Sequence, residues 1–161
     1  MDLLIMDCGA DIKGETTTTG YKDKIELMAF SHGVSMQITG DQSNQKRTSG
    51  KPNHQDMSVT KYVDLSSCKL LAHCNAGTAI KDVKIYVLQN EEDKINAILT
   101  YEMKDVVISS ISIGGGGGGK PTESVTLNYS QISWTYKPQM VNNQTKGQDA
   151  AKWNLATNKA E

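Results

Sequence analysis

The sequence predicts a mainly β fold, a barrel or sandwich with one helix packed on its side. Three observations support this prediction. Short apolar segments recur along the chain and are separated by polar or glycine-rich loops. Only the segment 66–76 has a convincing helical pattern. Two long segments change the parity of their apolar residues part-way, which is typical of strands that bend in a strongly curved sheet.

Alternating apolar residues predict the strands in chain order. We expect strands at 3–8, 23–38, 56–64, 83–87, 95–101, 107–113 and 124–136, with the helix between the third and the fourth. In the second strand the parity changes near Ser31–Gly33, and Gly33 suits a bend there. In the last strand the change falls at Ser130–Gln131. A turn is expected at 90–93.

The helix has recognisable ends. Ser66 or Ser67 is suited to cap its first N–H groups, and Gly77 is suited to the left-handed conformation that closes it. One apolar side is expected, formed by Leu70, Leu71 and Cys74. A helix of about ten residues is marginal alone in water, so it must dock on the sheet.

Length and composition indicate one soluble globular domain, 1–161, with a core at about 1–137 and a C-terminal tail at 138–161. The net charge is −1 and Arg47 is the only arginine, which argues against nucleic acid as a partner. No apolar run reaches the roughly 20 residues of a membrane helix, so no membrane insertion is expected. The three cysteines and the N-terminus suggest synthesis in a reducing cytosol without a Sec signal peptide.

The glycine run ending in Lys120 fits the first part of a phosphate-binding loop. That pattern then needs Ser or Thr and a helix, whereas here Pro121 and a strand follow, so a hinge loop is the better interpretation.

Cysteine and histidine residues suggest zinc only superficially. Cys68, His73 and Cys74 match no compact ligand spacing and lack a fourth ligand, so we interpret them as ordinary helix residues. His32 and His54 have no partner visible in the sequence, and a hydrolase using His54 or His73 ranks last among the hypotheses. No catalytic residue, cofactor site or metal site is therefore predicted.

The strand at 107–113 and the residues before it are apolar on both parities, as in Val106–Ile108. One sheet face packs the core, but a second apolar face needs another cover. A single helix is too small for this, so we predict a subunit interface.

Two longer stretches carry a specific resemblance. The first contains Arg47–Pro52, Gln55–Asp56, Thr60–Asp64 and Lys69–Leu71. The second contains Lys104–Val106, Ser109–Ser110, Pro121–Val125, Leu127–Tyr129 and Trp134–Tyr136, and Gly14–Glu15 and Trp153–Leu155 lie near the two ends. Together they resemble the haemolysin-coregulated protein (Hcp) family, the tube protein of bacterial type VI secretion.

The resemblance implies a compact β-barrel of two curved sheets with one lateral helix, similar to phage tail-tube proteins. It implies hexameric rings that stack into a tube, which a sheath expels from the cell. The implied partners are further copies of the chain, the sheath, spike and baseplate proteins, and small effector proteins in the lumen. The alternative is a secreted ring-shaped effector chaperone without stable stacking. The six-glycine run looks expanded, and His32 stands where members often carry an aromatic residue.

Two groups of site residues follow from this resemblance and from the loop 40–55. Arg47, Lys51 and Gln55 are expected at contacts with a neighbouring subunit or ring, the alternative being a solvated loop. Ser31 and His32, at the bend, are expected on the lumen wall, the alternative being a buried turn.

Overall fold

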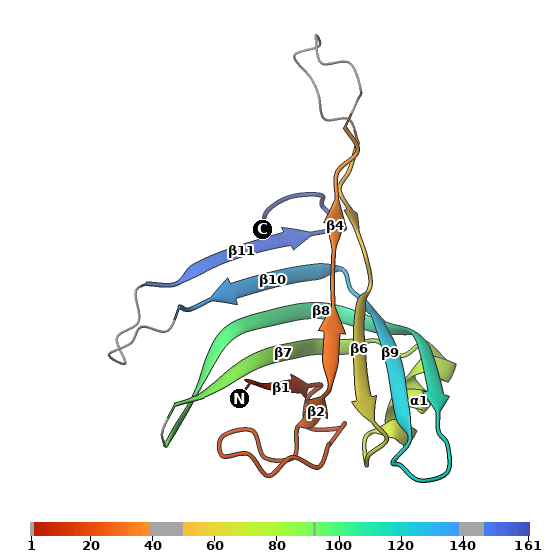
Figure 1. Ribbon diagram of the computed structural model, residues 1–161. Coiled ribbons are helices and arrows are strands. Elements are labelled where there is room, and N and C mark those ends of the chain that lie inside the picture. The colour runs from red at the N-terminus through yellow and green to blue at the C-terminus, as the bar shows by residue number, and fades with distance from the viewer. Residues whose placement is uncertain (1, 39–49, 92, 139–146) are drawn as a thin grey trace.

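The computed structural model describes residues 2–38, 50–91, 93–138 and 147–161 (Figure 1). In these residues eleven strands and one helix follow each other along the chain. They are β1 (Asp2–Asp7), β2 (Ile25–Leu27), β3 (Ala29–Ser31), β4 (Val34–Ser35), β5 (Asn53–His54), β6 (Met57–Tyr62), α1 (Ser67–Ala76), β7 (Ile80–Glu91), β8 (Lys94–Gly114), β9 (Thr122–Asn128), β10 (Gln131–Tyr136) and β11 (Asp149–Asn154). The predicted mainly β fold with one short lateral helix is confirmed.

Two curved sheets share β8: the first also contains β1, β2, β7, β10 and β11, and the second also contains β3, β6 and β9. A separate two-stranded sheet is formed by β4 and β5. The pairing order is β2-β1-β7-β8-β9-β6-β3, and β10 pairs with both β8 and β11. The two ends of this order, β2 and β3, are separated only by Met28, whose N–H donates to the carbonyl of Thr60 in β6 at 2.7 Å. The two edges of the sheet therefore meet at one residue, and the sheet curls around a common core.

Two expected strand boundaries were wrong. The strands predicted at 95–101 and 107–113 are one strand, β8, of 21 residues. Asp105 lies in it with a φ of 50° and does not end it, because aspartate tolerates the left-handed region. The strand predicted at 124–136 is instead divided into β9 and β10, which lie along successive parts of β8. The change of parity at Ser130–Gln131 is confirmed, since Tyr129 and Ile132 are both buried.

The segment 23–38 is divided into β2, β3 and β4 rather than one strand. Parity changes already at Met28, so Leu27 is buried and Ala29 is exposed. After the predicted bend at Ser31–Gly33, the chain leaves the barrel with β4 and returns with β5 (Figure 1). We call residues 32–38 and 50–55 the arm stem.

The helix ends as predicted but begins differently. Gly77 closes α1 with a φ of 62°. Ser66 makes no side-chain capping bond, and Asp64 instead accepts a hydrogen bond from the Ser66 N–H at 2.9 Å. The carboxylate has this role because it is already held between β6 and α1 by Lys61. Of the expected apolar side, Leu70 is buried in the core, Cys74 is half-buried and Leu71 is exposed.

The core lies inside the curled sheet. Most of its buried members come from β1, β2, β6, β7, β8, β9 and β10, and the others are Leu70 of α1, Cys8 and Ile12 after β1, and Tyr129 after β9. β11 lies in the segment expected as a tail, where it pairs with β10 over its whole length, and Trp153 packs against the core. In the described part of the chain no helix is long and apolar enough to cross a membrane.

Candidate functional site

Eight small side chains, seven of them with a hydroxyl group, form two rows across the outer face of the second sheet. The first row is Ser31–Ser58–Thr126–Ser110, and the second is Ala29–Thr60–Ser124–Ser112. Each row crosses β3, β6, β9 and β8, whose intervening residues Met57, Val59, Val125 and Leu127 point into the core. We call these eight residues the hydroxyl face. It carries no charge.

One edge of the hydroxyl face is closed by Asp56. Its carboxylate accepts hydrogen bonds from Ser109 Oγ at 2.7 Å and from Asn128 Nδ2 at 2.9 Å. Ser109 is the extra residue of a β-bulge in β8, so its side chain turns toward β9 and also contacts Thr126. The bulge therefore joins the root of the arm stem to the hydroxyl face.

The two residues expected on the lumen wall lie in different surroundings. Ser31 is exposed at the end of the first hydroxyl row. His32 follows it directly but is half-buried, and its Nε2 is hydrogen-bonded to Tyr129 Oη. Ser31 thus belongs to the hydroxyl face, whereas His32 belongs to the root of the arm stem.

Of the expected interface residues, Lys51 and Gln55 lie on the returning strand of the arm stem, and both are exposed. Arg47 lies outside the described residues. The Gln55 N–H donates to the Gly33 carbonyl at 2.9 Å, which fixes the spacing of the two strands. A Cβ on Gly33 would come within 2.8 Å of Oε1 at the end of the exposed Gln55 side chain, which can move aside.

The outgoing strand of the arm stem exposes large apolar side chains. Val34, Met36 and Ile38 are 49%, 40% and 60% exposed. Alternation puts these three residues on one side of the predicted strand, and in the structure that side is exposed. Alternation reports that one side of a strand avoids water, but it does not say whether the cover comes from the same chain.

Aromatic rings gather at the root of the arm stem. The ring centroids of His32 and His54 are 6.2 Å apart, and each histidine also packs against Tyr129. Tyr101 of β8 packs on His32, and Trp153 of β11 stacks on His54. We call these five residues the aromatic root. It joins the arm stem, β8, the turn after β9 and the C-terminal strand.

Tyr129 fixes the hydrogen-bond directions in the aromatic root. Its hydroxyl donates its single proton to the Gln55 carbonyl at 2.9 Å. It must therefore accept from His32, so the proton of neutral His32 lies on Nε2. Burial raises the pKa of Tyr129 far above the neutral range, and Asp56 raises it further, so the hydroxyl keeps this proton.

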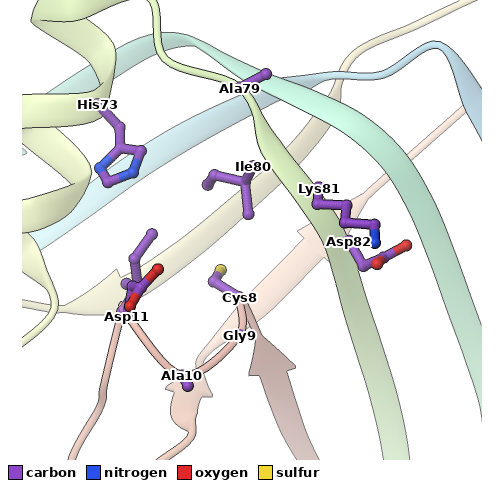
Figure 2. Close-up of a pocket in the computed structure, with 10 residues that line it drawn as sticks. Cys8, Gly9, Ala10, Asp11, His73, Ala79, Ile80, Lys81 and Asp82 are labelled. Carbon is purple, nitrogen blue, oxygen red and sulfur yellow. The ribbon is translucent and has the colours of Figure 1, made fainter.

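A hollow of about 400 Å³ lies between α1, the loop after β1 and the start of β7 (Figure 2). Cys8 points into it from the end of β1, facing Ile80, while His73 enters from α1. The Nδ1 of His73 is hydrogen-bonded to the Lys69 carbonyl. Burial raises the pKa of the Cys8 thiol to about 12, so Cys8 is a weak nucleophile at neutral pH.

Metal ligands do not cluster in the described residues, where no group of three or more His, Cys, Asp or Glu side chains is placed to hold an ion. Cys68 is exposed and Cys74 is half-buried, and both are free thiols. The described surface offers hydroxyl groups, apolar side chains, a few charges and the Cys68 thiol for contact with other molecules.

Comparison with known proteins shows which family this chain resembles. Residues 5–136 match the family described as type VI secretion system effector, Hcp. The Pseudomonas aeruginosa protein hcp1 is 33% identical over 150 residues, covering 92% of each chain. A solved structure of a type six secretion system protein is 27% identical with a TM-score of 0.92 and covers all of both chains. Hcp1 from Salmonella typhimurium is 20% identical with a TM-score of 0.78 and covers 99% of each chain.

The fold and these matches define a component of bacterial type VI secretion. Within that class, the chain belongs to the Hcp family.

Proposed function

We propose that the chain is the structural subunit of a type VI secretion tube, in which hexameric rings stack and small effector proteins are carried in the lumen. The observation that carries this proposal is the exposed apolar side of the arm stem, formed by Val34, Met36 and Ile38. It projects from the barrel on a narrow two-stranded arm (Figure 1). Neighbouring exposed apolar side chains on such a projection are typical of a surface that contacts another molecule.

A second copy of the chain is the cover that fits. A projection that meets a different surface on the next copy gives a heterologous interface, which closes into a ring or continues as a stack. Lys51 and Gln55 on the returning strand supply polar contacts at the rim of this interface. In this proposal the chain is made in the bacterial cytoplasm, is expelled with the tube, and meets sheath, spike and baseplate proteins there.

The composition of the hydroxyl face supports the proposal that this face lines the lumen. A tube wall made of small side chains leaves the widest bore, and an uncharged wall neither repels nor traps cargo of either charge. Hydroxyl groups donate and accept hydrogen bonds, so they offer weak and adaptable contacts. We place Ser31, at the end of the first hydroxyl row, on this wall.

Assembly is tested by the native mass of the purified chain, for which we expect six times 17.6 kDa and larger stacks. A monomer at all concentrations contradicts the proposal, while rings that never stack support the chaperone alternative. Met36→Ser with Ile38→Ser, or Lys51→Asp, should reduce stacking or ring closure in sedimentation. The control is Leu65→Ser, which removes an exposed apolar side chain outside the arm stem.

The lumen wall is tested by lengthening one side chain of the hydroxyl face. Ser31→Gln should reduce the retention of a small co-expressed effector and leave the ring mass unchanged. Ser133→Gln on the outward face of β10 serves as the control. Equal retention by the two variants would place Ser31 outside the lumen.

A further inference from the structure

The two histidines of the aromatic root face each other, and neither imidazole is paired with a carboxylate in the described part of the chain. We propose that His32 and His54 form a proton-sensitive latch that holds the arm stem against the barrel at neutral pH and releases it in acid. The latch acts within one chain. Its consequence for assembly rests on the proposed function of the arm stem.

The geometry of the latch starts with Tyr129. Its hydroxyl contacts both strands of the arm stem, because it accepts from His32 and donates to the Gln55 carbonyl. His54 packs between Tyr129 and Trp153, with its ring stacked on the indole at 6.4 Å and 23°. The arm stem is thus attached to the barrel and to β11 through two imidazole rings.

Protonation finds no favourable partner in this arrangement. Tyr101 and Tyr129 are the titratable groups that face the pair from β8 and from the turn after β9, and burial raises the pKa of both. Trp153 from β11 is uncharged. Asp56, next to the arm stem, keeps its negative charge, but its carboxylate accepts hydrogen bonds from Ser109 and Asn128 rather than from either histidine. The Nδ1 of His54 is buried without a hydrogen-bond partner in the described part of the chain, so a proton there would be an unsatisfied donor.

Acid should weaken the attachment, because the docked state disfavours the protonated form of both histidines. Burial lowers the pKa of both histidines below 6.5, and the neighbouring His54 lowers that of His32 further. A released arm binds protons with the ordinary pKa, so acid favours release. The attachment is complete above about pH 6.5 and weakens as the pH falls toward the lowered values.

The closing experiment measures attachment by amide hydrogen exchange of the full chain between about pH 7.5 and about pH 5. The Gln55 N–H bonds the Gly33 carbonyl across the same two strands that Tyr129 bridges, so it becomes exposed when the strands lose Tyr129 and separate. The Val63 N–H, bonded to the Pro121 carbonyl, reports the barrel. The protection factor of Gln55 should fall relative to that of Val63, by about tenfold for each pH unit between the docked and released pKa of one histidine.

Two variants separate titration from packing. His54→Phe keeps an aromatic ring against Trp153 and cannot take up a proton, and His32→Gln keeps an N–H donor for Tyr129. Each should reduce the acid-induced loss of Gln55 protection, and together they should abolish it. His73→Gln on α1, which lies outside the aromatic root, should behave like the unmodified chain.

Two results would overturn the latch. One is a Gln55 protection factor that follows that of Val63 at every pH, and the other is an unchanged acid response in the double variant. Both are measured within one chain, so they stand even if no rings form. Ring or stack dissociation in acid that disappears in the double variant would link the latch to assembly.

Discussion

Lys61 of β6 and Glu123 of β9 lie directly opposite each other in the sheet, and their charged groups form an ion pair with both side chains fully buried. The Lys61 ammonium also contacts Asp64 and the Ser67 hydroxyl, so the pair joins two strands to the start of α1. Ser67 donates to Glu123 at 2.9 Å, which completes the cluster.

Removing one partner of this pair should destabilise the chain strongly. Lys61→Met leaves the Glu123 carboxylate buried without its cation, and we expect a loss of about 3–5 kcal/mol in the free energy of unfolding. Urea unfolding measures the loss, and adding Glu123→Leu should recover part of it. The control is Lys120→Met, which breaks a 3.9 Å pair whose side chains are 55% and 57% exposed and should change stability by less than about 1 kcal/mol. Equal effects of the two single variants would contradict this account.

Tyr129→Phe should loosen the arm stem. The change leaves the Gln55 carbonyl without its donor and the His32 Nε2–H without its acceptor, which costs about 1–3 kcal/mol. Denaturant unfolding and exchange of the Gln55 N–H report the global and the local effect. Tyr136→Phe is the matched control, because Tyr136 is half exposed on β10. A stability loss in the control as large as in Tyr129→Phe would argue against a special role of this hydroxyl.

Gly14→Ala should destabilise the loop before β2. A Cβ at this position would lie 2.2 Å from the carbonyl oxygen of Lys24, and backbone cannot move aside as a flexible side chain does. We expect a loss of about 1–3 kcal/mol or more, seen as a lower melting temperature. Gly116→Ala, where a Cβ meets nothing within 4 Å, should leave the melting temperature nearly unchanged. A Gly14→Ala chain as stable as the control would contradict the close approach.

The thiols should react in an order set by burial. Cys68 is exposed on α1, whereas the Cys8 thiol is buried and its pKa is raised to about 12. A thiol reagent at about pH 8 should label Cys68 first and Cys8 only after unfolding. Mass spectrometry of the labelled chain gives the order, and Cys68→Ser should remove the fastest phase. Rapid native labelling of Cys8 would show that the hollow beside it opens readily.

In the candidate site, the alternation of residue types along each strand predicts only part of the arrangement. Period-two hydroxyl residues are visible in the printed sequence, as in Ser58–Thr60 and Ser124–Thr126. That signal puts the two residues of each pair on the same face of their own strand. It does not show that the pairs lie in register across four strands, so the hydroxyl face was missed and only Ser31 was selected. His32 and His54 were judged to lack partners for the same reason.

Local sequence was sufficient to predict the β class, the helix with its glycine end, and the change of face at Ser130–Gln131, because these depend on neighbours a few residues apart. The other change of face lies at Met28 rather than at Ser31–Gly33. Local sequence also misjudged the division of β8, β9 and β10 and the capping of α1, where a contact from another element decides. The tertiary structure alone brought Lys61 to Glu123, Tyr129 to both strands of the arm stem, and Ser31 into a hydroxyl row. These pairs are distant in sequence, and strand register, which no single strand encodes, sets which residues meet.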